Sequence, residues 1–174
     1  MKESHFIADV QAVIDSAKAR DNGRLERFIG SKVPNAGDEE VREASESALA
    51  VIETVPVLLL EAMRSARQKG VARMVDPLLE HAARYFVDPV DLIPEMTQGV
   101  PGLLDDAYLS IKILQHLNSG PQKFFEWDFE QPLSYLRALV GEEIADKLDG
   151  LSIQALQQVS ASVSNVWTEL ARDA

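Results

Sequence analysis

The chain has 174 residues, 46% of them hydrophobic and 26% charged, which is the composition of a folded domain rather than of a disordered segment. It contains no cysteine, and this excludes a disulfide framework, thiolate ligands for zinc or iron–sulfur clusters, and a cysteine nucleophile. Seventeen basic residues against 28 acidic residues give a formal net charge of −11. We therefore expect no binding to nucleic acid, whose phosphates carry the same sign.

The first 70 residues predict helices separated by short turns, because their apolar residues recur at helical spacing. The first helix is expected to end near Asn22-Gly23, a turn sequence, and residues 24–29 can form a short further turn. Residues 34–37 then form a linker. Asp38 is expected to cap the long helical stretch that follows.

Two prolines bear on where the next helices begin. We expect Pro56 to kink the long helix or to break it into two, because proline lacks the amide proton of the helical ladder. The second part ends on basic residues followed by Gly70, which is typical of a helix C-terminus. Asp76-Pro77 is predicted to start the following helix, with the aspartate as N-cap and the proline at the first helical position.

A connection rich in chain breakers lies in the centre of the sequence. A continuous helix is excluded there by five residues, Pro89, Pro94, Gly99, Pro101 and Gly102. The next helix is predicted from Leu103 to Leu117. Because polar residues interrupt its apolar ones, we expect this helix to be amphipathic; these residues are Ser110, Lys112, Gln115 and His116.

Residues 121–174 predict a second helical block. One apolar stripe runs from Leu133 to Leu148, with a bend allowed at Gly141, and another runs from Leu156 to Leu170. The last stripe spans too few heptads for a coiled coil, so we expect it to pack on its own domain rather than on a second chain.

Together these patterns predict a single all-α domain, a compact bundle of six to seven helices with an irregular Pro/Gly-rich connection between its central helices. It comprises an N-terminal helical arm (residues 1–70), a central segment (71–120) and the C-terminal helical block (121–174).

The central connection and its neighbours resemble a known family. Residues 85–95 read YFVDPVDLIPE and residues 102–107 read GLLDDA. This order resembles the YkvA-like family, whose pattern is an aromatic helix end, a P-x-D-L-I-P-[DE] loop, and then a glycine and paired aspartates that open a helix. The resemblance covers about residues 78–117. It implies a helical bacterial domain of unknown function that is often joined to membrane-spanning helices. The amphipathic character expected of residues 103–117 argues against such a membrane association here.

The same segment is unusual in its charge. From residue 85 to residue 111 there is no lysine or arginine, while five carboxylates lie there, namely Asp88, Asp91, Glu95, Asp105 and Asp106. Two interpretations of these carboxylates stay open, one architectural and one chemical.

In the architectural interpretation, Asp91 caps the turn that begins at Leu92. Asp105 and Asp106 lie in the first turn of their helix, where backbone N–H groups and the helix dipole stabilise carboxylates, and one of them faces water. In the chemical interpretation, the five carboxylates supply hard oxygen ligands to Mg²⁺ or Ca²⁺, although their spacing matches no EF-hand.

Other candidate sites carry less information. The chain contains no H-E-x-x-H, G-x-S-x-G, Walker A or G-x-G-x-x-G motif. A pair between His81 and Asp88 fits helical spacing, but a lone helical histidine is more often packed or solvated. Four aromatic residues would pin the C-terminal block onto the rest of the domain, or form a partner surface if exposed; they are Phe124, Phe125, Trp127 and Phe129.

The sequence therefore favours a non-enzymatic module for protein interaction or regulation, with a protein partner or self-association. The alternative is a divalent-metal-binding protein or metal-dependent enzyme that uses the five carboxylates, with Mg²⁺ or Ca²⁺ as its only implied cofactor. A weaker alternative is a peripheral membrane protein. No apolar stretch is long enough to span a membrane and the N-terminal residues lack a signal-peptide pattern, so we expect a cytoplasmic location.

Overall fold

The computed structural model describes residues 5–88, 99–158 and 160–172, and within them helices are the only regular secondary structure. The α-helices are α1 (His5–Ala19), α2 (Arg24–Lys32), α3 (Asp38–Gln68), α4 (Ala72–Val87), α5 (Leu104–Gln115), α6 (Glu130–Val140), α7 (Glu142–Gln158) and α8 (Ser160–Arg172). Two 3₁₀-helices, η2 (Val100–Leu103) and η3 (His116–Ser119), flank α5. The all-α prediction is confirmed. The predicted number of helices is too low, because the described residues already form eight α-helices.

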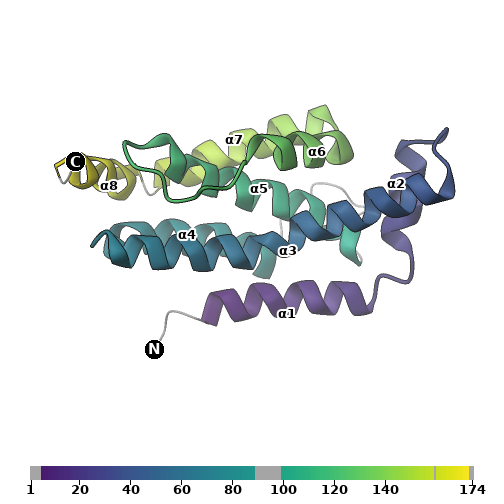
Figure 1. Ribbon diagram of the computed structural model, residues 1–174, viewed down its shortest axis with the longest axis horizontal. Coiled ribbons are helices and arrows are strands. Elements are labelled where there is room, and N and C mark those ends of the chain that lie inside the picture. The colour runs from purple at the N-terminus through teal and green to yellow at the C-terminus, as the bar shows by residue number, and fades with distance from the viewer. Residues whose placement is uncertain (1–4, 89–98, 159, 173–174) are drawn as a thin grey trace.

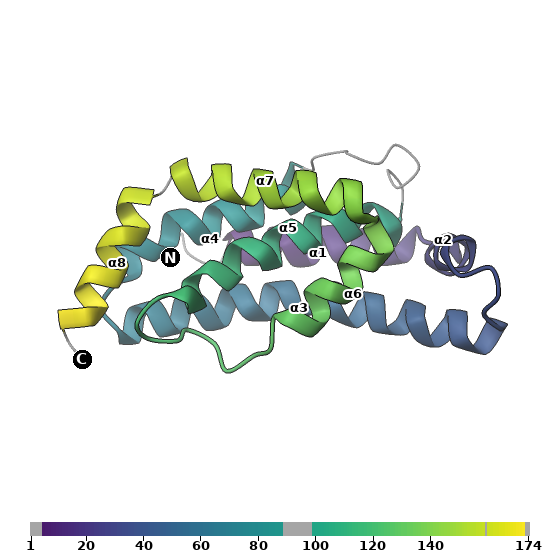
Figure 2. The same cartoon turned by 90° about the horizontal axis from the view of Figure 1, so that it is seen from above.

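Helix α5 lies in the middle of the molecule, and the longer helices surround it. Helices α1, α3 and α4 lie on one side of α5, and α6 and α7 lie on the other (Figures 1 and 2). Helix α2 is at one end of the molecule, and α8 packs against α4 and α7 at the opposite end. The central helix α5 thus belongs to the resemblance segment.

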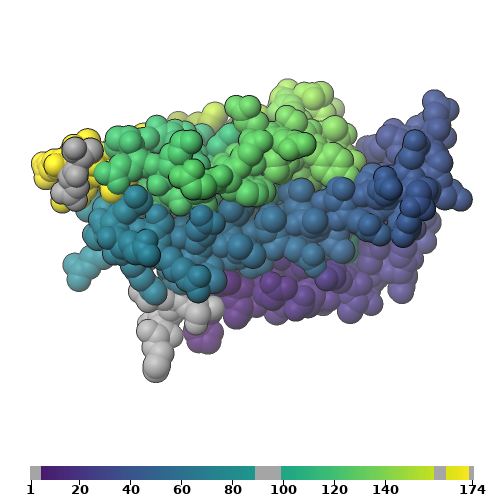
Figure 3. Space-filling model, viewed as in Figure 1, coloured from purple at the N-terminus to yellow at the C-terminus, as the bar shows by residue number. Residues whose placement is uncertain are grey.

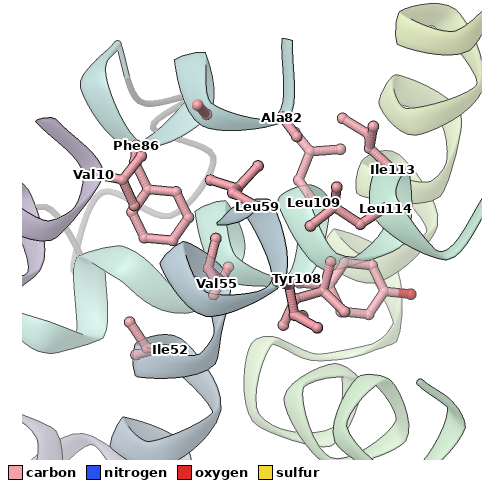
Figure 4. Packing of buried hydrophobic residues seen from close by; sticks show 14 of the residues in the cluster. Val10, Ile52, Val55, Leu59, Ala82, Phe86, Tyr108, Leu109, Ile113 and Leu114 are labelled. Atoms are coloured by element: carbon pink, nitrogen blue, oxygen red, sulfur yellow. The ribbon is translucent and has the colours of Figure 1, made fainter. Parts of the chain in front are cut away.

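The core is continuous from α1 to α7. Figure 4 shows Val10, Val55 and Phe86 packed together where α1, α3 and α4 meet α5. Tyr108 of α5 lies at the edge of this cluster, and its hydroxyl group is directed away from the apolar side chains. A core of this kind excludes water from almost the whole length of α5.

The prediction that residues 103–117 form an amphipathic helix is wrong for most of their length. Every residue from Leu104 to Ile111 is buried, including Ser110, which has no exposed surface. The Ser110 hydroxyl donates a hydrogen bond of 2.7 Å to the Ala82 carbonyl oxygen of α4. Ser110, one of the polar residues that suggested an exposed face, is therefore satisfied inside the protein, whereas Lys112 and Gln115 in the last turn are partly exposed.

The prolines lie inside helices rather than at their boundaries. Helix α3 continues through Pro56, so of the two predicted alternatives the break is wrong, and Pro56 itself is buried. Helix α4 begins at Ala72, which places Pro77 inside the helix rather than at its start. Each proline costs the helix one backbone hydrogen bond. Packing offsets that cost, because the neighbours Val55 and Leu78 are completely buried in the core.

Glycines mark the helix ends more reliably than the prolines do. Gly70 follows α3 with φ of +72°, and the amides of Gly70 and Val71 donate to the carbonyl oxygens of Arg67 and Ala66 at 3.1 Å and 2.9 Å. This is a Schellman motif. Gly141, with φ of +92°, turns the allowed bend into a complete separation of α6 from α7.

The start of α3 differs from prediction by one residue. Gly37, rather than Asp38, occupies the N-cap position, and Asp38 lies in the first turn. The Gly37 amide donates a hydrogen bond of 2.9 Å to the Glu40 carboxylate, which is one half of a capping box.

Helix α8 packs on its own domain, as the sequence predicts. Val166 and Leu170 are buried, and the Leu170 carbonyl oxygen accepts a hydrogen bond of 3.1 Å from the Gln122 side chain. Trp167 lies directly over Gly120, since a Cβ atom at residue 120 would come within 2.3 Å of the indole ring. Residue 120 must therefore be glycine, because the indole ring leaves no room for a Cβ atom.

Two glycines in different backbone conformations, Gly70 in the Schellman motif and Gly150 inside α7, are predicted to respond oppositely to replacement by alanine. We expect Gly70→Ala to lower the free energy of unfolding by about 1 kcal/mol, because an L-residue is strained at positive φ. Gly150→Ala, in the interior of α7, is expected to raise it by about 0.5–1 kcal/mol. A Cβ atom meets nothing within 4 Å at either position, so packing is matched. Urea unfolding measures both values, and a shift of the same sign in both variants would contradict this account.

Candidate functional site

The two aspartates of the resemblance segment lie at the start of α5. Asp105 and Asp106 occupy the first turn of the helix, directly after η2. Their exposed fractions are only 4% and 2%. The Asp105 carboxylate accepts a hydrogen bond of 3.0 Å from the Asp106 amide, one of the backbone donors that the first turn leaves unpaired. The expectation that one aspartate faces water is wrong, because the surrounding helices cover both.

The remaining carboxylates of the predicted metal set are placed differently. Asp88 is exposed at the C-terminal end of α4, where its amide donates to the Arg84 carbonyl oxygen at 2.7 Å. Asp91 and Glu95 lie outside the described residues. Within the described part of the chain, no three histidine, aspartate or glutamate side chains are grouped so as to hold a metal ion. The divalent-cation site therefore stays a prediction.

A third aspartate, Asp21, contacts this region, and the sequence analysis did not predict its role. Its carboxylate accepts a hydrogen bond of 2.9 Å from the Val100 amide and another of 3.2 Å from the Leu25 amide. One side chain thus joins the start of α2 to the start of η2. Gly99, with φ of +75°, allows this close approach, since a Cβ atom there would lie 3.0 Å from the Asp21 carboxylate. The only sequence signal is an aspartate just before a turn and a helix.

A polar network joins Tyr108, in the second turn of α5, to α6 and α7. The Tyr108 hydroxyl donates to the Asp149 carboxylate at 2.8 Å, and the Arg137 guanidinium donates to the same carboxylate at 3.0 Å. Arg137 also forms ion pairs with Glu142 and Asp146. Burial, together with the hydrogen bond to Asp149, raises the pKa of Tyr108 to about 12, so the phenol stays protonated. Tyr108, Arg137 and Asp149 are too far apart in the sequence for any motif or helical spacing to predict this network.

His81 and His116 are both partly buried. His81 meets the Tyr85 ring edge-on, with 5.9 Å between ring centroids, and the described residues show no hydrogen bond between His81 and Asp88. Burial lowers the pKa of His81, with a further contribution from Arg84. Burial likewise lowers the pKa of His116, and the nearby Lys112 ammonium adds to the effect.

Three of the four predicted aromatic residues are buried. Phe124, Phe125 and Phe129 belong to the core, whereas Trp127 is half-exposed and packs edge-on against Phe129, with ring centroids 4.9 Å apart. Asn118 holds the segment in place, because its side-chain oxygen accepts hydrogen bonds from the Phe124 and Phe125 amides at 2.9 Å and 3.0 Å. Asn118 thus joins the aromatic segment to η3, and of the four aromatic rings only that of Trp127 is partly accessible.

The histidine environments predict a loss of stability at mildly acidic pH. An unfolded histidine titrates near pH 6.5, whereas the folded pKa values of His81 and His116 are lower, so the unfolded chain binds more protons as the pH falls through about 6.5. The free energy of unfolding is therefore expected to fall between pH 7.5 and pH 5.5. Thermal unfolding across this range measures it.

His116→Gln is expected to remove about half of that fall, because one of the two histidines remains. His5→Gln, at the exposed start of α1, is the matched control and should keep the wild-type fall. An unchanged fall in His116→Gln would contradict the assignment.

Comparison with known proteins identifies the central segment alone. Residues 82–110 match the model of a family described as a protein of unknown function (DUF1232). These residues begin in α4 and end in α5, so they include the aspartate pair and Ser110. No curated protein and no solved structure matches the chain. No helix within the described ranges is both long and apolar enough to cross a membrane. Over residues 82–110 the chain is similar to an uncharacterised family of bacterial type, in agreement with the expected resemblance.

Proposed function

We propose that this protein is a non-enzymatic interaction module that binds a protein partner along the outer face of α3. The family segment supports this proposal by what its polar groups do. Ser110 donates to a backbone carbonyl oxygen, Asp105 accepts from a backbone amide, and the Val100 amide donates to Asp21. Groups bound to protein backbone in this way hold the fold together, and this directs the search for function to the surface.

The outer face of α3 offers a groove of suitable character. The groove has a volume of about 450 Å³ and runs between α3 and the segment that contains Phe124. Val57 and Leu60 supply apolar surface to its lining, and Glu61 and Arg64 supply charge. The full length of α3 lies on the face of the molecule seen in Figure 3. Apolar surface rimmed by charged groups is typical of protein interaction sites.

The exposure of Val57 is the observation that carries the proposal. Its side chain is 61% exposed in the middle of a long helix whose adjacent residues Pro56 and Leu58 are buried. A valine in a helix has one preferred rotamer, so Val57 presents a fixed apolar surface at little entropic cost. Of the large exposed apolar residues among those described, Val57 is the one that lines the groove.

The proposal predicts that Val57→Glu weakens binding about tenfold without unfolding the protein. A glutamate would place a charge within the apolar contact, while an exposed helical substitution changes stability by only about 0.5 kcal/mol. Ile153→Glu, at a 52% exposed position of α7, is the matched control.

The measurement is quantitative recovery of cross-linked proteins with the tagged chain, a second copy included. At least one protein should be recovered equally with the wild type and Ile153→Glu and about tenfold less with Val57→Glu. Equal recovery with Val57→Glu, or no specific protein at all, would count against the proposal.

The divalent-metal-binding alternative is favoured by a separate observation, the burial of two adjacent carboxylates, Asp105 and Asp106, at the start of α5. A native-state ion raises the unfolding midpoint by mass action. If the alternative holds, Mg²⁺ or Ca²⁺ should raise the midpoint in a saturable way, and a chelator should reverse the rise. Asp105→Asn and Asp106→Asn should each abolish it, whatever their own midpoints are. Identical curves with and without the cations would exclude this function.

A further inference from the structure

The outer face of α3 changes the sign of its charge along its length. Glu39 and Glu43 are exposed on the N-terminal half of the helix, and Arg64 is exposed on the C-terminal half. Between them, Ala50 and Val57 present small and apolar side chains to solvent. Over the whole helix, residues 38–53 carry six acidic groups and one basic group, whereas residues 54–68 carry one acidic group, Glu61, and two basic groups.

We infer that a second copy of the chain binds antiparallel along this face, about a two-fold axis near the middle of α3. This inference rests on the proposed interaction function and names its partner. A face that is acidic at one end and basic at the other is complementary to itself only when the second copy runs in the opposite direction. The arrangement also closes the assembly at two copies, because both partners use the same surface.

The register follows from the positions of the charged and uncharged residues. If Glu43 of one copy lies opposite Arg64 of the other, symmetry places the reciprocal pair at the opposite end, and these two pairs lie about 32 Å apart at 1.5 Å rise per residue. The same register sets Val57 of each copy against the small Ala50 of the other. A small residue facing a larger one allows the two helices to approach closely, so the apolar centre can be covered.

The ion pairs within the chain leave the necessary charges available. Arg42 pairs with Glu39 and with Glu46 on its own helix, the latter at 3.6 Å. Within the described ranges, neither Glu43 nor Arg64 takes part in an intramolecular ion pair. The register brings Glu46 towards Glu61, and the Arg42 pair reduces the charge that Glu46 presents there. Arg42 is near enough to Glu43 to attract its charge, but its ion pairs are with Glu39 and Glu46, so Glu43 and Arg64 define the preferred pairing between copies.

The experiment is a charge-reversal series measured by light scattering coupled to size-exclusion chromatography. The wild type should form a dimer. Arg64→Glu and Glu43→Arg should each raise the dimer dissociation constant by about tenfold or more, because symmetry makes each reversal act at two contacts. Mixing the two single variants should restore a heterodimer, since each then meets the opposite charge. The double variant should dimerise on its own.

Arg84→Glu, an exposed reversal on α4, is the control and should leave the dimer unchanged. Circular dichroism of each variant shows that the helices are retained. A wild type that stays monomeric at high micromolar concentration would overturn the inference. If the wild type is a dimer but mixing Arg64→Glu with Glu43→Arg restores no heterodimer, the antiparallel register is wrong. If the chain is monomeric but Val57→Glu still loses a different bound protein, self-association fails and the proposed interaction function stands.

Discussion

The burial of α5 on all sides is the constraint on which the rest of the structure depends. A helix without a solvent-facing side must be covered by several others, and α3, α4, α6 and α7 all contact it. Each polar group on α5 then needs a partner from a neighbouring helix. Ser110 finds the Ala82 carbonyl oxygen of α4, and Tyr108 finds Asp149 of α7. These hydrogen bonds fix the rotation of α5 about its own axis.

The start of α5 shows how acidic residues can be architectural. Helix α5 begins inside the protein, so its first amides cannot turn to water for hydrogen bonds. Asp105 supplies an acceptor within the helix itself. Asp21, which precedes Val100 by 79 residues, supplies an acceptor to the amide at the start of η2. Carboxylates are favoured here because the helix dipole and the backbone donors act in the same direction. The position of Asp105 therefore has a physical reason in the backbone donor that it binds.

Local signals in the sequence predicted local features. Gly70 and Gly141 end helices because glycine takes positive φ without strain. A glycine at such a position is seen directly in the sequence. The prolines misled because tertiary packing can outweigh the loss of one hydrogen bond, as it does at Pro56. The character of α5 was misjudged because Ser110 counts as polar in any sequence pattern, while its partner Ala82 lies on another helix.

Parts of the candidate site could not be predicted for the same reason. Asp21 acts on Val100, 79 residues away, and the Arg137 network draws on three helices. No spacing rule relates such residues, since only the folded chain brings them together. The aspartate pair was found because its two members are adjacent. The contact of Asp21 with the same region was missed because 79 residues separate Asp21 from Val100.

The contact between Gly120 and Trp167 restricts how this protein can vary during evolution. The indole ring occupies the space that any side chain at residue 120 would need. A relative with a larger residue at 120 must therefore carry a smaller one at 167, or dock its last helix differently. Positions 120 and 167 should accordingly change together among proteins that share this C-terminal block, and a glycine at 120 together with a tryptophan at 167 would identify those that keep α8 in this place.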